Sequence, residues 1–362
     1  MTGEMVGPPD DALLRLLWMV ALGEVVVVVA LLAGVVTLHF TKTLQLRRRN
    51  RFHATWRPLL VQSLTDSPQS VPPVRSRDIL NFLFYWNYFH ESLLGEDKIV
   101  GLNQLARLAG MDSAAKRFLK AKGLRKRLMA IITLGHLREQ SAWNDLAALA
   151  QSTHPIVSLS AARALVDIDP KAALAVITPW IGARADWSPP RVAALLSQAG
   201  SELIAQPLSH AAMTAAPDMA MRLLHYLEIT RCTMALPAVR ALVARKSTDR
   251  AVRVACLKLI GQFQDPKDLA LVRSFISDSD ESVRAQAAAA LGTIGMPADE
   301  GPLIALLSDS QWDVRYRAAE ALAHLPFMKP ERLVEIQHQQ TDRLAKQILE
   351  PFLVATNGVP SV

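Results

Sequence analysis

A short apolar pattern returns along the carboxy-terminal two thirds of the chain and constrains its fold more than any other feature. The clearest copies begin at Val252, Val283 and Val314, 31 residues apart. Apolar residues fall at i, i+4, i+7, i+8 and i+11 of each copy, which is one face of a helix with 3.6 residues per turn. Weaker copies begin at four positions upstream: Leu124, Val157, Pro190 and Met219. The pattern therefore predicts seven similar helices.

A second apolar segment precedes each copy, as at residues 268–277 and 302–308, and Pro or Asp-Ser turns separate the two. The repeating unit is therefore a helical hairpin. A hairpin of this size cannot bury its apolar face alone, so consecutive units must stack to form a continuous core.

The best copy, Asp280 to Gly295, reads Asp-x-x-Val-Arg-x-x-Ala-x-x-Ala-Leu-x-x-Ile-Gly. This pattern resembles the HEAT repeat in its short form of about 30 residues, and the resemblance extends over roughly residues 90–350. It implies an all-α fold, a HEAT-like α-solenoid of stacked helix pairs at residues 124–356, used mostly as a scaffold. The resemblance implies no chemistry.

The amino-terminal segment predicts a single transmembrane helix at residues 13–40, preceded by a short extracytoplasmic tail at 1–12. Its most apolar part, 16–37, contains one charged residue, Glu24. At 1.5 Å per residue a helix of this length crosses a hydrocarbon core of about 30 Å. A carboxylate inside a membrane is costly unless it is protonated or paired, so we interpret Glu24 as a contact with a membrane partner or as a tolerated defect.

Basic residues follow the predicted span, and no acid occurs before Asp66. Positive charge stays on the cytoplasmic side. We therefore expect a single-pass protein of the cell membrane, the inner membrane in a bacterium, with its amino terminus outside and its repeats in the cytoplasm. A cleaved signal peptide would carry its bases before the apolar core. The bases that follow the span are Lys42, Arg47, Arg48, Arg49, Arg51 and Arg57.

Residues 41–77 are interpreted as a basic juxtamembrane segment that ends in a Pro-containing linker. Anionic lipid is the expected partner of Arg47, Arg48, Arg49 and Arg51. Residues 78–123 are interpreted as aromatic capping helices. Two readings stay open for their six clustered aromatic residues: a cap on the first repeat, or a helix that binds the membrane or a partner. These six are Phe82, Phe84, Tyr85, Trp86, Tyr88 and Phe89.

The segment 116–127 holds seven bases in twelve residues and no acid. It predicts either an anion site for lipid headgroups, a small anionic ligand or an acidic partner, or a loop made soluble by its charge. The bases are Lys116, Arg117, Lys120, Lys122, Arg125, Lys126 and Arg127.

An arginine recurs at one position of the repeat. Arg253, Arg284 and Arg315 should therefore line up, as should Arg125 and Arg191 upstream. We expect them to bind neighbouring repeats; the alternative is a concave ligand-binding surface. Asp249 and Asp280 stand where a carboxylate caps the following helix.

The net charge of +7 lies outside the array, because residues 128–362 sum to −1 whereas 41–65 sum to +6 and 66–127 to +5. No nucleic acid partner is therefore expected. No motif predicts a catalytic residue, a metal site or a cofactor. We expect a scaffold or accessory subunit that binds an integral membrane protein, such as a glycosyltransferase or another envelope-assembly enzyme. Two alternatives stay open: a sensor of an anionic ligand, and a HEAT-like enzyme such as a lyase or hydroxylase.

Overall fold

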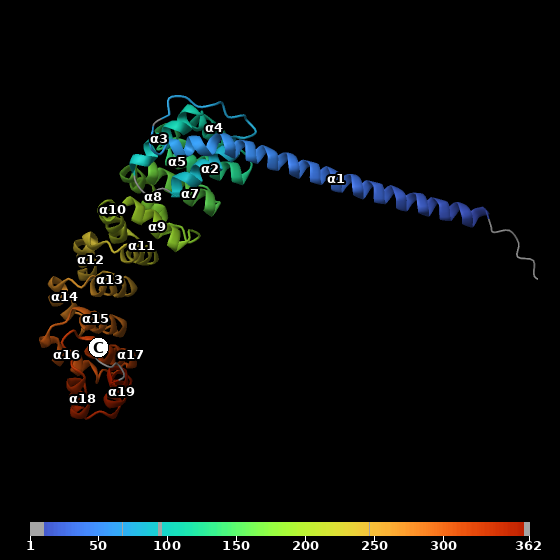
Figure 1. Ribbon diagram of the computed structural model, residues 1–362. Coiled ribbons are helices and arrows are strands. Elements are labelled where there is room, and N and C mark those ends of the chain that lie inside the picture. The colour runs from blue at the N-terminus through green and yellow to red at the C-terminus, as the bar shows by residue number, and fades with distance from the viewer. Residues whose placement is uncertain (1–10, 67, 93–95, 246, 358–362) are drawn as a thin grey trace, which may run out of the picture. The chain divides into compact units, whose positions relative to one another are not determined.

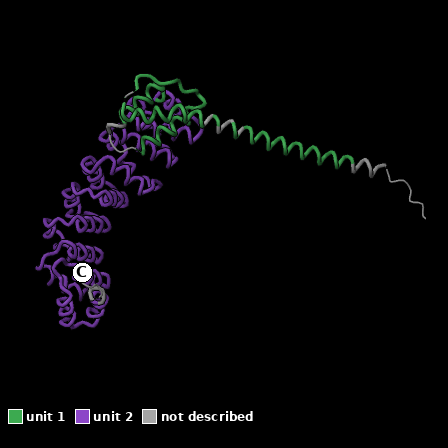
Figure 2. The backbone as a smooth tube through the Cα atoms, viewed as in Figure 1, with its two compact units in different colours: residues 1–111 green, residues 112–362 purple. Residues whose placement is uncertain are grey.

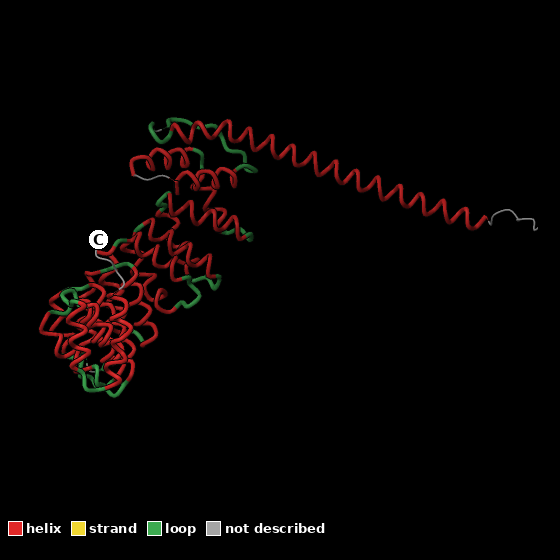
Figure 3. The backbone as a smooth tube through the Cα atoms, turned by 60° about the horizontal axis from the view of Figure 1, so that its bottom comes forward, coloured by secondary structure: helices red, strands yellow, loops and turns green. Residues whose placement is uncertain are grey.

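The structure, a computed structural model, describes residues 11–357 except 67, 93–95 and 246. This part of the chain is helical and contains no strand (Figure 3). It forms two compact units, residues 1–111 and 112–362 (Figure 2). The all-α prediction is confirmed.

The first unit begins with one long helix, α1 (Asp11–Gln62) (Figure 1). Its stretch Trp18–Phe40 has a mean hydropathy of 2.7 and is fully exposed along its length. Length and composition fit a membrane span and equally a signal sequence. The helix continues through the basic residues after Phe40 without a break, so these residues lie on a continuous helix rather than in a loop.

Aromatic rings fill the core of the first unit. The end of α1 packs against α2 (Ile79–Ser92), where the Trp56 and Phe82 rings meet edge to face with centroids 4.7 Å apart. The indole Nε1 of Trp86 donates to the Leu102 carbonyl on α3 (Glu96–Leu108) at 2.8 Å. The aromatic residues of α2 are thus covered partly by α1, through an apolar stripe that the sequence analysis did not single out. This stripe is Phe52, Trp56 and Leu60.

The second unit, which begins within α4 (Met111–Leu119), stacks helices in two rows. All seven predicted copies of the repeat lie in the inner row, which confirms that prediction. The inner row is α5 (Leu124–His136), α7 (Pro155–Ile168), α9 (Pro189–Ala199), α11 (Pro217–Ile229), α13 (Arg250–Phe263), α15 (Glu281–Ile294) and α17 (Trp312–His324). The outer row is α6 (Trp143–Ala150), α8 (Pro170–Ala183), α10 (Ser201–Thr214), α12 (Leu236–Ala244), α14 (Leu269–Arg273), α16 (Glu300–Leu306) and α18 (Pro330–Gln339), and α19 (Arg343–Asn357) follows.

Small residues set the spacing of the inner row. A Cβ atom on Gly292 of α15 would lie 2.7 Å from the Cα of Ala321 on α17. A Cβ on Gly261 of α13 would lie 3.0 Å from the Cα of Ala290 on α15. The inner helices therefore meet backbone to backbone, which explains why the repeat carries Ala and Gly at these positions.

The stack is less regular around α9, where the sequence pattern is weakest. There α8 reaches α11 directly, because Gly182 faces the Met219 side chain and the Arg222 guanidinium donates to the Gly182 carbonyl at 2.7 Å. Helix α9 begins at a Pro pair and ends before Gly200, whose φ of +92° only glycine adopts readily.

Candidate functional site

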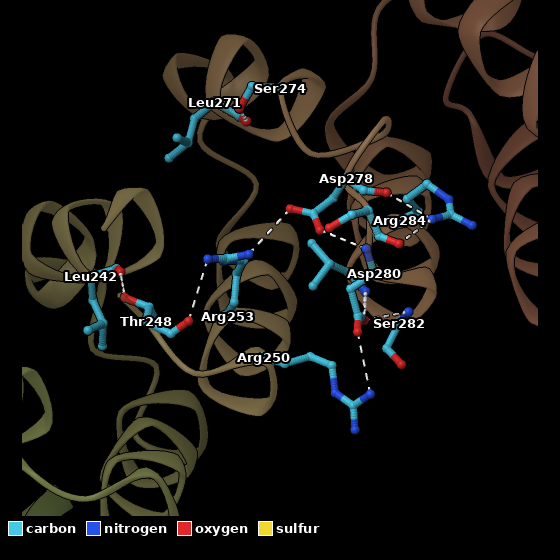
Figure 4. Close-up of polar contacts among 12 residues, drawn as sticks. Leu242, Thr248, Arg250, Arg253, Leu271, Ser274, Asp278, Asp280, Ser282 and Arg284 are labelled. Atoms are coloured by element: carbon cyan, nitrogen blue, oxygen red, sulfur yellow. Dashed lines mark hydrogen bonds and ion pairs between the residues drawn. The ribbon is translucent and has the colours of Figure 1, made fainter. Parts of the chain in front are cut away.

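Two ladders of ion pairs join the last repeats, one through arginines of the inner row and one through arginines of the outer row. In the first, Arg253 of α13 reaches the Asp278 carboxylate at 3.3 Å, and Arg284 of α15 binds Asp309 through two hydrogen bonds of 2.9 and 3.0 Å. Figure 4 shows Arg253 between Asp278 and the Thr248 carbonyl. These arginine side chains are at most 17% exposed. Their contacts match the expectation that they bind neighbouring repeats.

The second ladder was missing from the sequence analysis. Arg240 of α12 binds the carboxylates of Asp268 and, at 2.6 Å, Asp265. Arg273 of α14 binds Asp299 at 2.5 and 2.9 Å. Asp268 and Asp299 are each 1% exposed. The sequence does contain a signal for this ladder. Asp268 and Asp299 each follow a Pro-x dipeptide, and the two copies are 31 residues apart.

The pKa values of two ladder carboxyl groups depend on both burial and hydrogen bonding. Burial acts to raise the pKa of Asp309, but hydrogen bonds from Arg284 and the Gln311 amide outweigh it, so the pKa of Asp309 lies below its usual range. The same balance, with Arg273 and the Met296 amide as donors, lowers the pKa of Asp299. Asp299 and Asp309 are therefore ionised at neutral pH.

The remaining members of the arginine series differ from these. Arg315 donates to the Asp309 carbonyl at 2.6 Å. Arg125 and Arg191 are exposed, and no carboxylate of the described chain pairs with either. The predicted helix caps are confirmed, since Asp249 accepts from the Ala251 amide and Asp280 from the Ser282 and Val283 amides.

The inner face of α13, α15 and α17 holds a hollow of about 280 Å³. Its floor is made of small residues, among them Ala289, Ala290, Gly292 and Ala321. Its rim is polar. The rim residues are Lys258, Gln262, Gln286, Glu320 and His324.

The rim offers both signs of charge and several hydrogen-bonding groups to solvent. Lys258 is 52% exposed and pairs at 3.0 Å with Glu228, which also accepts from the Gln262 amide at 2.8 Å. Glu320 pairs with Arg317 at 2.7 Å. Surface pairs of this kind contribute little to stability, so a bound partner can displace them at small cost.

A second hollow, of about 370 Å³, lies on the same row between α7 and α9. Arg163 and Arg191 line it beside the exposed Ile156. Burial raises the pKa of the nearby Asp167, against the opposing effects of Arg163 and Gln198. This hollow lies where the repeat pattern is weakest.

Three of the seven bases in segment 116–127 contact other residues of the protein. Lys116 pairs with Glu139 at 3.0 Å, Arg127 donates to the Ala121 carbonyl at 3.0 Å, and Lys126 lies over the Phe118 ring. The other four are exposed, and no carboxylate within the described residues pairs with them. These are Arg117, Lys120, Lys122 and Arg125.

The amino-terminal candidates belong to the first unit. Glu24 lies exposed on the apolar part of α1, and Arg47 and Arg51 are exposed further along the same helix. The side chains of Arg48 and Arg49 lie outside the described residues. Among described residues, no three His, Cys, Asp or Glu side chains gather as metal ligands would. Burial raises the pKa of the Cys256 thiol to about 12, so this cysteine is an unreactive core residue.

Several solved structures are similar to this chain. Kap121p is similar in structure at 13% identity with a TM-score of 0.46, over 80% of this chain, which spans 38% of the length of Kap121p. Human deoxyhypusine hydroxylase is similar at 18% identity with a TM-score of 0.29, over 74% of this chain and 94% of that one. These likenesses carry no functional inference. No curated protein matches. A family model for HEAT repeats matches residues 236–323, so α12 to α17 are HEAT repeats.

Proposed function

We propose that the protein is a membrane-anchored scaffold or accessory subunit. Its HEAT-like array would hold a partner protein of a membrane complex in the cytoplasm, beside the membrane. The observation that carries the proposal is the hollow on the inner face of α13, α15 and α17, with its small-residue floor and polar rim. The expected partner is an integral membrane protein, for instance a glycosyltransferase of envelope assembly.

The size of the hollow favours a protein side chain over a free cofactor. Small-molecule pockets usually enclose roughly 300–1,000 Å³ and bury most of their ligand. At about 280 Å³ this hollow falls just below that range. It suits one large side chain of a partner, with amide and charged groups around it for hydrogen bonds, which is how protein interfaces place their anchors.

The ladders support the same proposal because they leave the inner face free. Arg253, Arg284 and their carboxylates are not among the residues that line the hollow. A partner can therefore bind there without breaking these ion pairs. A rigid array of this kind meets its partner preorganised.

Photocrosslinking in living cells tests the binding face. A benzophenone amino acid at Gln286, on the rim, should crosslink one membrane protein in high yield. The matched control is the same amino acid at Lys267, an exposed residue on the turn before α14. Equal crosslinking at the two positions would contradict the proposed face.

Reporter fusions test the anchor and its orientation. A cytoplasm-dependent reporter fused after residue 65 should be active, and a reporter that requires export should be inactive, because the bases that follow Phe40 stay inside. Activity of the exported reporter alone would indicate the opposite topology, with the repeats outside. Release of a shortened soluble chain would identify residues 18–40 as a cleaved signal.

A second candidate function rests on the open bases of segment 116–127. Four exposed bases that pair with no described carboxylate suit an anionic ligand, so a sensor role is the alternative. Full-length protein with Lys120→Glu and Arg125→Glu should then lose anion binding and keep its crosslinked partner. Loss of the partner instead would show that the segment serves the scaffold.

A further inference from the structure

A hollow lined by arginines lies within the first unit, between α1 and the linker that precedes α2. It encloses about 830 Å³. Arg47 and Arg51 line it from α1, and Arg75 and Arg77 line it from the linker. Asp78 is the single carboxylate in the lining. The hollow therefore gathers guanidinium groups from two separate segments around one space.

The placement of these arginines follows from the local structure. Arg47 and Arg51 are four residues apart on a helix, so their side chains lie one above the other on one face. Pro72 and Pro73 restrict the linker, which runs beside this face and carries Arg75. Phe52 and Trp56 supply an apolar wall.

Three arginines of the lining have no carboxylate partner among the residues that the structure describes. Arg47, Arg51 and Arg75 are exposed, and none of them forms an ion pair with a carboxylate of the described chain. Like charges this close repel one another unless an anion sits between them. Guanidinium groups bind phosphate oxygens in pairs through parallel hydrogen bonds.

We infer that this hollow binds a phosphate-bearing ligand with at least two negative charges, of the kind found in a phosphomonoester or a pyrophosphate. The free ligand and a lipid headgroup share this chemistry. The lining belongs neither to the inner face of the repeats nor to the basic segment 116–127, so it is a third, separate site.

The position along α1 makes a lipid headgroup the expected source. Arg47 and Arg51 follow Phe40 by seven and eleven residues, which is about 10–16 Å along a helix. The headgroup layer extends about 5–8 Å beyond the hydrocarbon, so Arg47 lies just beyond this layer and its long side chain can reach back to a headgroup phosphate. This step rests on the proposed span, whereas the phosphate chemistry does not.

Titration calorimetry on the full-length protein in neutral detergent tests the site. The probes are inorganic pyrophosphate in one arm and dihexanoyl phosphatidic acid in the other, with dihexanoyl phosphatidylcholine as the zwitterionic comparison of zero net charge. We expect saturable binding of at least one anionic probe and none of phosphatidylcholine. Tighter binding of phosphatidic acid identifies a lipid source, and tighter binding of pyrophosphate identifies a soluble one.

Two double variants separate a site from bulk charge. Arg75→Gln with Arg77→Gln should weaken anion binding at least tenfold, and Arg47→Gln with Arg51→Gln, from the opposite wall, should do the same. The matched control, Lys171→Gln with Arg343→Gln, removes the same charge from exposed positions of the repeats and should change binding less than twofold. Equal losses in all three variants, or no saturable binding of either anion, would overturn the inference. Neither arm needs a membrane or a partner protein, so this failure is distinct from failure of the scaffold role.

Discussion

Between α12 and α17, arginines cross from one repeat to the next and end on carboxylates, as Arg273 does on Asp299 and Arg284 on Asp309. Between α7 and α11, arginines that cross repeats end on carbonyls, as Arg222 does on Gly182 and Arg184 on Ser152. In the first region each repeat supplies an aspartate carboxylate to an arginine of the preceding repeat, and the stack stays regular. In the second the acceptors differ, α8 reaches past α9 to α11, and a hollow opens between α7 and α9.

This contrast shows what a regular repeat contributes beyond an apolar face. Burial of leucine and alanine holds both regions together, since the core runs through all of these helices. The spacing between neighbours is set by polar pairs and small residues, which only the last repeats provide at constant intervals. A binding face made of three successive helices needs that constant spacing.

The largest expected effect comes from the close approach of α15 and α17. Gly292→Ala adds a Cβ that must push Ala321 away, so we expect the free energy of unfolding to fall by about 2–3 kcal/mol. Gly301→Ala in α16, where a Cβ meets nothing within 4 Å, should instead raise it by about 0.5–1 kcal/mol. Urea denaturation followed by circular dichroism measures both. Equal effects would mean that the inner helices are not in backbone contact.

Breaking one ladder pair gives the next largest effect. Arg273→Leu leaves the buried Asp299 with only the Met296 amide as a donor, and should cost about 2 kcal/mol. Arg222→Leu, which frees a carbonyl in the irregular region, should cost about 1 kcal/mol. The same denaturation experiment compares them.

The pH dependence of these two variants should differ in kind. The pKa of Asp299 is lowered in the folded protein, because the hydrogen bonds outweigh burial, so its stabilisation is present above its ordinary pKa of about 4 and is lost as pH falls through the folded value. The penalty of Arg273→Leu should therefore shrink below about pH 4, whereas that of Arg222→Leu should stay constant. A constant penalty for both would contradict the ionised pair.

The smallest effect concerns a feature that the two regions share. Gln264 and Arg231 lie at the ends of inner helices with φ of +53° and +49°. This left-handed conformation is unfavourable for any residue that carries a Cβ atom. Replacing either by Gly should raise the free energy of unfolding by about 0.5–1 kcal/mol. A gain at Gln264 alone would mean that α11 ends differently from α13 in solution.

The sequence was sufficient to place the inner helices and their caps. The apolar positions after Val252, Val283 and Val314 mark one helical face each, and Asp249 and Asp280 cap as expected. The copies at Pro190 and Met219 match the pattern least, and they are the helices around which the stack loses its regularity. The local pattern thus predicted the fold, and the stack is least regular where that pattern matches least.

The sequence analysis did not predict the contacts in which the two partners recur at different intervals along the chain. Arg240 and Arg273 are 33 residues apart while Asp268 and Asp299 are 31 apart, so no single template aligns donors with acceptors. The arginine-lined hollow was missed for a similar reason: Arg75 and Arg77 follow a turn whose path brings them back to Arg47 and Arg51. Pairings of this kind depend on chain direction in space, which a periodic pattern does not specify.

The proposed role of the inner face is tested most directly by filling its hollow. Ala289→Arg places a long charged side chain over the floor between α13 and α17, while Ala270→Arg adds the same side chain to an exposed position of the outer helix α14. We predict that full-length protein purified in mild detergent carries a stoichiometric membrane protein, that Ala289→Arg loses it, and that Ala270→Arg retains it. Retention by both folded variants, as judged by circular dichroism, would contradict a partner bound at this face.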